Sequence, residues 1–252
     1  MKNKKYLGQH WLKDRIVLTN IAGCAIMDNI GTVLEIGPGL GVLTSALFKC
    51  FKQVIAVEYD PDLARKLPGQ FPGKNLKVIH ADILDFDLET LPPDYVAVGN
   101  IPYYITSPII MKLLTSSHRP RRIVLLVQKE VAQRIAAAPG RHTILSLAAQ
   151  AYAEVSLGPV IGRALFTPPP KVDSQVIILD PYPQPIITED TIAFAKKGFA
   201  APRKKLISNL TATLRLPRST VQAALDQVGI PPNARPADLS LLSWQALHQA
   251  LV

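Results

Sequence analysis

Short apolar runs alternate with amphipathic stretches along the chain up to Asp180. Turn residues bound each run, which is typical of strands and helices that alternate in a parallel sheet. The stretches between the runs gather apolar side chains on one helical face, as residues 42–47 and 109–114 do. The pattern predicts an α/β fold with strands at residues 32–36, 53–58, 76–81, 95–99, 123–128, 155–161 and 174–179.

The pattern changes after Asp180. The proline-rich stretch 181–185 is typical of a stiff linker, and the residues after it contain no plausible strand. Helical spacing of apolar residues continues instead, and residues 219–222 have the composition of a capping box. We therefore predict an α/β domain at residues 1–181 and a small all-helical domain at residues 182–252.

Two other helix starts carry local signals. Residues 106–108, Thr-Ser-Pro, offer a capping hydroxyl and a proline for the first helical position. Pro202 predicts a second start, which would place the cations at 203–205 in a first turn that disfavours positive charge. A bound phosphate would offset that repulsion, although a solvated surface explains the cations equally well.

A cofactor site is indicated by residues that follow the first three strands. The first strand leads into a glycine-rich turn with Gly37 and Gly39, and such turns let the backbone approach a ligand closely. The second strand ends at Glu58, 21 positions after Gly37, where a carboxylate can accept both hydroxyl hydrogens of a ribose. Asp82 follows the third strand and could accept from an adenine amino group. Together they predict a nucleotide-like cofactor, although the turn alone could be structural and an Asp after a strand usually caps a helix.

A nicotinamide cofactor is the main alternative for this turn. The dinucleotide fingerprint GxGxxG requires a glycine at position 42, which is Val42 here. We therefore expect another cofactor, and a nicotinamide oxidoreductase stays a distant alternative.

The fourth strand ends in the tetrapeptide Asn100-Ile101-Pro102-Tyr103. An adenine amino nitrogen is a poor nucleophile because its lone pair is delocalised into the ring. If the Asn100 side-chain oxygen and the Ile101 carbonyl each accept one N–H, the lone pair can point at a methyl group, and both oxygens stabilise the developing charge. Pro102 fixes the chain direction, and Tyr103 offers a face on which a base can stack. In isolation the tetrapeptide could be an ordinary turn, but its place after the cofactor turn predicts a methylation site.

Composition and charge favour a polyanionic partner. The 252 residues include 28 Lys and Arg against 19 Asp and Glu, a formal net charge of +9. Such a balance favours nucleic acid, because phosphate contacts release counterions, yet many basic proteins bind none. Cys24 and Cys50 form no CxxC pair, so we expect small buried hydrophobes and no metal site. Without a signal-peptide pattern or an apolar run of membrane length, the sequence predicts a cytoplasmic protein.

These motifs together resemble those of the ribosomal RNA adenine dimethyltransferase family over nearly the whole chain. Residues 7–12, Leu-Gly-Gln-His-Trp-Leu, are similar to the family's LGQNFL, and residues 100–103 to its NLPY or NIPY. The segments 35–41, 128–135 and 166–174 are similar to further family segments. The resemblance implies a Rossmann-like, seven-stranded methyltransferase domain that uses S-adenosylmethionine, followed by a helical domain that recognises RNA.

Two places depart from the family pattern. His10 and Trp11 stand where the family has Asn and Phe, so the contact made by position 10 is open. Residues 201–205, Ala-Pro-Arg-Lys-Lys, keep the charge of the family's paired arginines but change its geometry.

The resemblance and the basic clusters together predict three sets of site residues. The residues expected to bind the cofactor are Gln9, His10, Leu12, Glu35, Gly37, Gly39, Glu58, Asp82, Ile83 and Asn100. The catalytic set, in which Tyr103 and Phe166 sandwich the target adenine, is Asn100, Ile101, Pro102, Tyr103 and Phe166. The basic residues expected to contact RNA, for which solubility is the alternative explanation, are Arg119, Arg121, Arg122, Arg134, Arg203, Lys204 and Lys205.

The resemblance also implies a target and a partner. We expect dimethylation of N6 on two adjacent adenines near the 3′ end of small-subunit ribosomal RNA, by a monomer that meets an immature small ribosomal subunit. Two alternatives stay open. One is a macrolide-resistance type of methyltransferase that acts on 23S ribosomal RNA, and the other is a ribosome-assembly checkpoint factor that acts mainly by binding.

Overall fold

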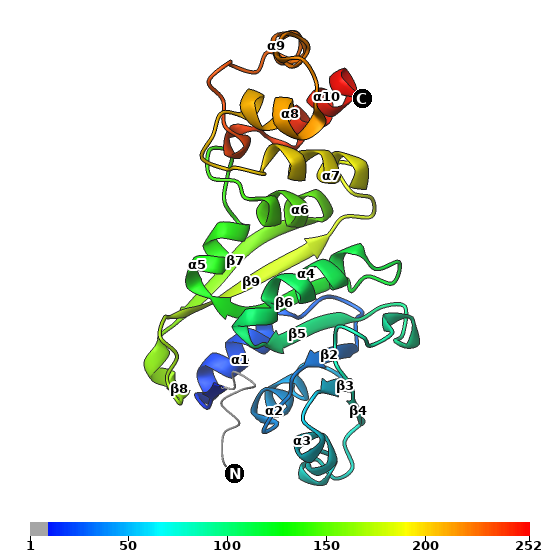
Figure 1. The fold of residues 1–252 in the computed structure, drawn as a ribbon. Helices are drawn as coiled ribbons and strands as arrows, with labels where there is room; N and C mark the ends of the chain where they lie inside the picture. Colours follow the sequence, from blue (N-terminus) through cyan, green and yellow to red (C-terminus); the bar gives the residue numbers. More distant parts are fainter. Residues whose placement is uncertain (1–9) are drawn as a thin grey trace. The chain divides into compact units, whose positions relative to one another are not determined.

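The computed structural model describes residues 10–252 and contains a seven-stranded sheet (Figure 1). Its strands are β2 (Thr32–Ile36), β3 (Gln53–Glu58), β4 (Leu76–His80), β5 (Val96–Asn100), β6 (Arg122–Gln128), β7 (Ala153–Ile161) and β9 (Ser174–Pro181). Their order is β4-β3-β2-β5-β6-β9-β7. The pairs from β4 to β6 are parallel, and β9 runs antiparallel to β6. The predicted α/β fold with seven strands is confirmed.

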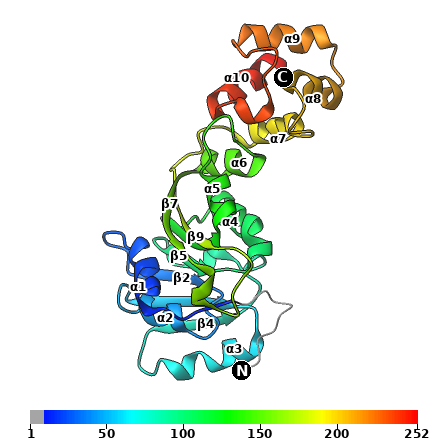
Figure 2. The ribbon, with the colours of Figure 1, turned by 90° about the vertical axis from the view of Figure 1, so that its left-hand side faces the viewer.

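Helices cover both faces of this sheet. Figure 2 shows α1 (Arg15–Cys24) and α2 (Val42–Leu47) on one side and α4 (Thr106–Thr115) on the other. The apolar faces of α1 and α2 join buried side chains of β2, β3, β5 and β6 in one core cluster. The central strands β2, β3, β5 and β6 are apolar on both faces because both faces are covered, which explains why their sequences are near-continuous apolar runs rather than alternating ones.

The register of the parallel strands brings their carboxyl ends to one edge. Ile36 of β2 pairs with Val57 of β3 and with Gly99 of β5, and Glu58 pairs with His80 of β4. Residues that follow the four strands therefore share this edge, where ligands bind in open α/β sheets.

The remaining elements are short or lie in the helical part of the chain. Close to the sheet, β1 (Trp11–Leu12) pairs antiparallel with β8 (Phe166–Thr167), and α3 (Pro61–Lys66) follows β3. The single-turn helices are Pro68–Gln70, Leu88–Thr90, Tyr103–Ile105, Arg163–Leu165 and Pro236–Asp238. The other helices are α5 (Lys129–Ile135), α6 (Ile144–Tyr152), α7 (Glu189–Gly198), α8 (Leu206–Leu214), α9 (Arg218–Gln227) and α10 (Leu241–Leu251).

The chain divides into two compact units. One contains residues 1–132 and 154–181, and the other contains residues 133–153 and 182–252. The second unit is helical and packs around Trp244, which is fully buried against Phe194 and Phe199. The predicted boundary after residue 181 coincides with one division, but the segment 133–153 belongs to the helical unit rather than to the first domain.

The predicted helix start at Thr106 matches the structure without its expected hydroxyl cap, and the other two predicted starts differ from the structure. The helix α4 begins at Thr106 after Ile105, with no side-chain cap, because the Thr106 hydroxyl is buried rather than turned back to the helix end. The helix α9 begins at Arg218 directly after Pro217, so residues 219–222 lie within it and cap nothing. The helix α8 begins only at Leu206, because a turn closed by Lys204 N and Ala201 O precedes it, and the cations at 203–205 lie before the first turn.

The expectation for the cysteines was also wrong in part. Cys24 and Cys50 are free, but both are half-buried rather than buried. Burial raises the pKa of the Cys24 thiol, while the charge of Arg122 lowers it.

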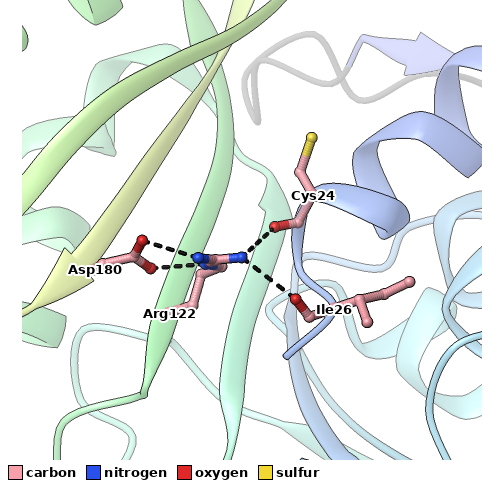
Figure 3. A network of polar contacts seen from close by, with 4 residues as sticks. All are labelled: Cys24, Ile26, Arg122 and Asp180. Carbon is pink, nitrogen blue, oxygen red and sulfur yellow. Dashed lines mark hydrogen bonds and ion pairs between the residues drawn. The ribbon is translucent and has the colours of Figure 1, made fainter. Parts of the chain in front are cut away.

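Arg122 has a structural role in this fold, and its predicted contact with RNA stays a prediction. Its guanidinium forms two parallel bonds with Asp180, Nε to Oδ1 at 2.7 Å and Nη2 to Oδ2 at 2.9 Å (Figure 3). Nη1 donates to the carbonyls of Cys24 and Ile26, both at 3.3 Å. The side chain therefore ties the end of α1 to β6 and β9, and such forked, charge-assisted bonds are the strong ones.

We predict that Arg122→Ala lowers the free energy of unfolding by roughly 1 to 3 kcal/mol, because two carbonyls and a carboxylate lose their donor. Arg121→Ala is the matched control, since the ion pair of Arg121 with Asp94 is 61% and 57% exposed and such pairs contribute little. Urea unfolding of both variants measures the difference. Equal losses would contradict the structural role of Arg122.

Candidate cofactor and substrate pocket

The glycine-rich turn after β2 has the left-handed backbone that glycine allows. Gly37 has φ 65° and Gly39 has φ 57°. A Cβ at Gly39 would overlap the Trp11 ring, whereas a Cβ at Gly37 would meet nothing within 4 Å. The turn is therefore packed against the segment of Trp11 and open to a ligand beside Gly37.

Glu58 ends β3 next to this turn and is 6% exposed. Its Oε2 accepts from Gly39 N at 2.9 Å, and its Oε1 accepts from Asp60 N at 2.8 Å. Burial raises the pKa of Glu58, and these two amide bonds lower it. Each oxygen keeps a further lone pair, so the carboxylate can still accept the two hydroxyls of a ribose, as the sequence predicts.

Asp82 and Ile83 follow β4. The Asp82 Oδ1 accepts from Leu84 N at 2.8 Å, so the residue caps a turn as an Asp after a strand usually does. One oxygen makes this bond, and Oδ2 is the atom that could meet an adenine amino group. The structural and the functional interpretation of Asp82 are compatible.

The last residue of β5, Asn100, is held by the N-terminal segment. Its Nδ2 donates to the main-chain carbonyl of His10 at 3.2 Å. This bond uses the amide nitrogen, so the side-chain oxygen Oδ1 remains as an acceptor. Tyr103 follows in a single turn of helix, and its hydroxyl bonds to Ser174 Oγ at 2.7 Å. Burial raises the pKa of Tyr103, whereas the Ser174 bond lowers it.

These residues line one pocket of about 420 Å³. The volume lies within the range of small-molecule and cofactor sites. With its open glycine turn and an acceptor carboxylate at the end of β3, the pocket fits a nucleoside cofactor. The predicted site residues that line it are His10, Leu12, Gly37, Gly39, Glu58, Asp82, Ile83, Asn100, Ile101, Pro102 and Tyr103.

Of the predicted cofactor-binding and catalytic residues that the structure describes, Phe166 and Glu35 are not among this lining. Gln9 lies outside the residues that the structure describes. Phe166 is 3% exposed and belongs to the core cluster, because β8 pairs it with Leu12. The pocket lining does not support its predicted sandwich with Tyr103, which stays a prediction.

Glu35 lies inside the sheet rather than in the pocket. It is fully buried, and its Oε2 accepts from Thr44 Oγ1 at 2.6 Å. Within residues 10–252, its Oε1 has no hydrogen-bond partner. Burial raises the pKa of Glu35 to about 8, against the lowering effect of the Thr44 bond. Its predicted contact with the cofactor therefore stays a prediction that the pocket lining does not support.

The basic residues of the RNA-binding set differ in their surroundings. Arg203, Lys204 and Lys205 are exposed in the turn before α8. Arg121 pairs with Asp94 at 2.7 Å on the surface. For these residues, as for Arg119 and Arg134, RNA contact stays a prediction.

Several residues of the site were missed from the sequence, among them two aromatic residues and one serine. Trp11 and Tyr59 line the pocket, and Ser174 holds Tyr103. Tyr59 could have been found, since it directly follows the acidic residue at the end of its strand. Ser174 could not, because its contact with Tyr103 joins positions 71 residues apart.

Among residues 10–252, no three His, Cys, Asp or Glu side chains gather in a way that could hold a metal ion. In the same part of the chain, no helix has the length and apolarity that a membrane crossing requires.

Two solved structures that this chain resembles are RNA-modifying transferases by name. A dimethyladenosine transferase from Plasmodium falciparum matches with a TM-score of 0.82 and 26% identity, over 94% of this chain and 96% of the other. The 23S rRNA methyltransferase ErmE matches with a TM-score of 0.76 and 31% identity, over 96% of this chain and 99% of the other. Fold and pocket together define a Rossmann-like methyltransferase.

The sequence comparisons give the family. The model of the family described as ribosomal RNA adenine dimethylase matches residues 1–251. A relative from Thermosynechococcus vestitus, ribosomal RNA small subunit methyltransferase A, is 39% identical over the whole of this chain and 97% of its own length. The chain belongs to the ribosomal RNA adenine dimethylase family. It is a ribosomal RNA adenine dimethyltransferase that takes its methyl groups from a donor of the S-adenosylmethionine type.

The raised pKa of Glu35 predicts a pH-dependent stability. Between the ordinary value of 4.5 and the folded-state value of about 8, the unfolded chain ionises Glu35 and the folded chain does not. The contribution of Glu35 to the free energy of unfolding is therefore fully present below pH 4.5. It is lost as the pH rises through about 8.

We expect Glu35→Gln to gain stability relative to the wild type as the pH rises from 5 to about 8, since glutamine does not ionise. Melting temperatures of the cofactor-free protein across this range measure the effect. Glu154→Gln, on the surface, is the control. Parallel curves for wild type and Glu35→Gln would contradict the assignment.

Proposed function

We propose that this enzyme transfers methyl groups from S-adenosylmethionine to N6 of two adjacent adenines near the 3′ end of small-subunit ribosomal RNA. The observation that carries the proposal is the arrangement of Asn100. Its amide nitrogen is occupied by the His10 carbonyl, and its Oδ1 remains in the pocket as an acceptor for an amino hydrogen. Adenine N6 carries two such amino hydrogens.

The pocket supports S-adenosylmethionine as the donor. Glu58 would accept the ribose hydroxyls, Asp82 Oδ2 the adenine amino group, and the backbone beside Gly37 would approach the rest of the molecule. When bound, this cofactor supplies a methyl group on a positively charged sulfur. The carboxylate of Glu58 is held by two amides before any ligand arrives, so little reorganisation accompanies binding.

Catalysis then rests on positioning. Asn100 Oδ1 and the Ile101 carbonyl each accept one N–H of the target amine, which directs its lone pair at the methyl group. The same two dipoles stabilise the positive charge that develops on nitrogen. The methylated nitrogen is acidic and releases its proton to these acceptors or to water, so no strong base is needed. The Tyr103 ring, fixed at its hydroxyl by Ser174, provides a face for the base.

The RNA partner is supported by charge and by the relatives. The exposed cations Arg203, Lys204 and Lys205 suit phosphate contacts, and the Asp94 ion pair of Arg121 is exposed enough to exchange for a phosphate. The relative from Thermosynechococcus vestitus is named as a small-subunit enzyme and matches this chain more closely than ErmE does. The target adenines must lie in a loop or be flipped out, because duplex RNA hides its base edges. A single chain acting on an immature small subunit is the arrangement we propose.

We predict that Asn100→Ala lowers the rate of methyl transfer on the order of 10²- to 10³-fold, because an acceptor aimed at developing charge is lost. Single-turnover assays with labelled cofactor measure this rate, and Asn75→Ala, on the surface, is the control. Retained binding of small subunits by Asn100→Ala would show that binding and methyl transfer are separable. An unchanged rate would exclude the proposed role of Asn100.

The choice of target predicts which RNA becomes labelled. Small subunits from cells that lack the modification should accept label from S-adenosylmethionine, and protein-free large-subunit RNA should not. Mapping the label to N6 of two neighbouring adenines would complete the assignment. Label in the large-subunit RNA alone would overturn the proposed target and favour the 23S type of enzyme.

A further inference from the structure

The Asp82 turn, residues 82–86, follows β4 and carries the carboxylate that the proposed function assigns to the adenine amino group of the cofactor. Main-chain bonds close this turn, since Phe86 N donates to Asp82 O at 2.9 Å and Asp85 N donates to the same oxygen at 3.1 Å. Just before the turn, Ala81 N donates to Glu58 O at 3.1 Å. The turn is therefore fastened to the neighbouring strand β3 at its start.

A lysine from α4 fastens the turn on its other side. Lys112 Nζ donates to the carbonyl of Leu84 at 2.7 Å, and Leu84 N donates to Asp82 Oδ1 at 2.8 Å. Leu84 therefore binds the lysine through its oxygen and the carboxylate through its nitrogen. A bond from an ammonium group to a carbonyl is charge-assisted and is stronger than a bond between two neutral groups.

The charges around Lys112 favour this placement. Three acidic residues, Asp85, Asp87 and Glu89, line one hollow together with Lys112. Opposite charges attract over several ångströms, so these carboxylates favour an ammonium group in this place. The Lys112 side chain is half-buried, and ordering it costs conformational entropy, which the bond to Leu84 and the nearby carboxylates offset.

The helix that carries Lys112 also borders the cofactor pocket. Ile109 of α4 lines this pocket, and Lys112 follows it by three positions, which are neighbours on a helix surface. Lys112 itself is not among the lining residues. Any effect of its side chain on the cofactor must therefore pass through the Asp82 turn.

We propose that Lys112 is a positioning residue for the cofactor, and that its bond to the Leu84 carbonyl keeps Asp82 directed at the adenine amino group. This inference rests on the proposed function, in which Asp82 Oδ2 accepts from that group. The consequence is specific. Without the lysine the Asp82 turn loses one of its two attachments, whereas Glu58 keeps both of its amide bonds and its contact with the ribose.

Two ligands separate recognition of the amino group from the rest of binding. S-Adenosylhomocysteine, the cofactor after methyl transfer, has an amino group at C6 of its purine. S-Inosylhomocysteine has an oxygen there, which accepts hydrogen bonds and is repelled by a carboxylate. The ratio of the two dissociation constants therefore measures the contact with Asp82. Partial unfolding of a variant weakens both affinities by the same factor, so the ratio does not depend on the folded fraction.

Isothermal titration calorimetry of the full chain measures both constants. We expect the wild type to favour S-adenosylhomocysteine about 10- to 150-fold, the range of a hydrogen bond to a charged group. Lys112→Met should reduce this preference by about 5-fold or more, the factor for one net hydrogen bond, and Lys112→Arg, which keeps a donor, should restore most of it. Lys196→Met, which removes an exposed helix lysine, is the matched control and should keep the wild-type preference. If Lys112→Met does not fold, Lys112→Gln takes its place, because its side chain is one bond too short for the same contact.

Asp82→Asn distinguishes a failure of this inference from a failure of the proposed function. The asparagine oxygen can still accept from Leu84 N, but its amide presents a donor where the amino group would lie. If Asp82→Asn leaves the preference unchanged, the proposed contact of Asp82 with adenine is wrong, and the inference is wrong with it. If Asp82→Asn lowers the preference and Lys112→Met does not, the contact stands and the role of Lys112 is refuted. An equal loss of affinity for both ligands in Lys112→Met would also overturn the inference, since it would make Lys112 a residue of general stability.

Discussion

The parallel pairing of β2 with β3 and β5 is the constraint on which the rest of the site depends. Parallel strands in register end at the same edge, so one turn or loop after each strand is delivered to a common place. The glycine turn, Glu58 and Asn100 are far apart in the chain. They share this edge because the glycine turn directly follows β2, Glu58 is the last residue of β3, and Asn100 is the last residue of β5. A shift of one residue in either pairing would turn Glu58 or Asn100 to the opposite face and separate them.

The sheet contains two buried carboxyl groups, Glu58 and Glu35, whose surroundings affect their ionisation differently. Glu58 sits at the end of β3, where main-chain amides of the next turn and of the glycine turn satisfy both of its oxygens. Glu35 lies within β2 between covered faces, and one hydroxyl is its partner. A glutamate side chain can therefore accept hydrogen bonds from a ligand at the strand end, as Glu58 can. Inside the sheet it is kept uncharged near neutral pH, as Glu35 is.

Local sequence was sufficient for the parts of the fold that depend on burial and strand ends. The predicted strands β2 and β3 match residue by residue, because apolar runs of that length between turn residues fit few other structures. The residues at their carboxyl ends then followed from topology. The burial of Phe166 and the clamp made by Arg122 could not be predicted, since both arise where segments distant in sequence meet. The predicted starts of α9 and α8 were wrong for a related reason, since Pro217 and the turn at 201–204 determine where these helices begin.

The bond between the His10 carbonyl and the Asn100 amide has a consequence for variation at position 10. Every amino acid carries that carbonyl, so the orientation of Asn100 is insulated from the identity of the side chain beside it. Substitutions at position 10 therefore change a side chain that lines the pocket, while the main-chain contact that orients Asn100 stays in place.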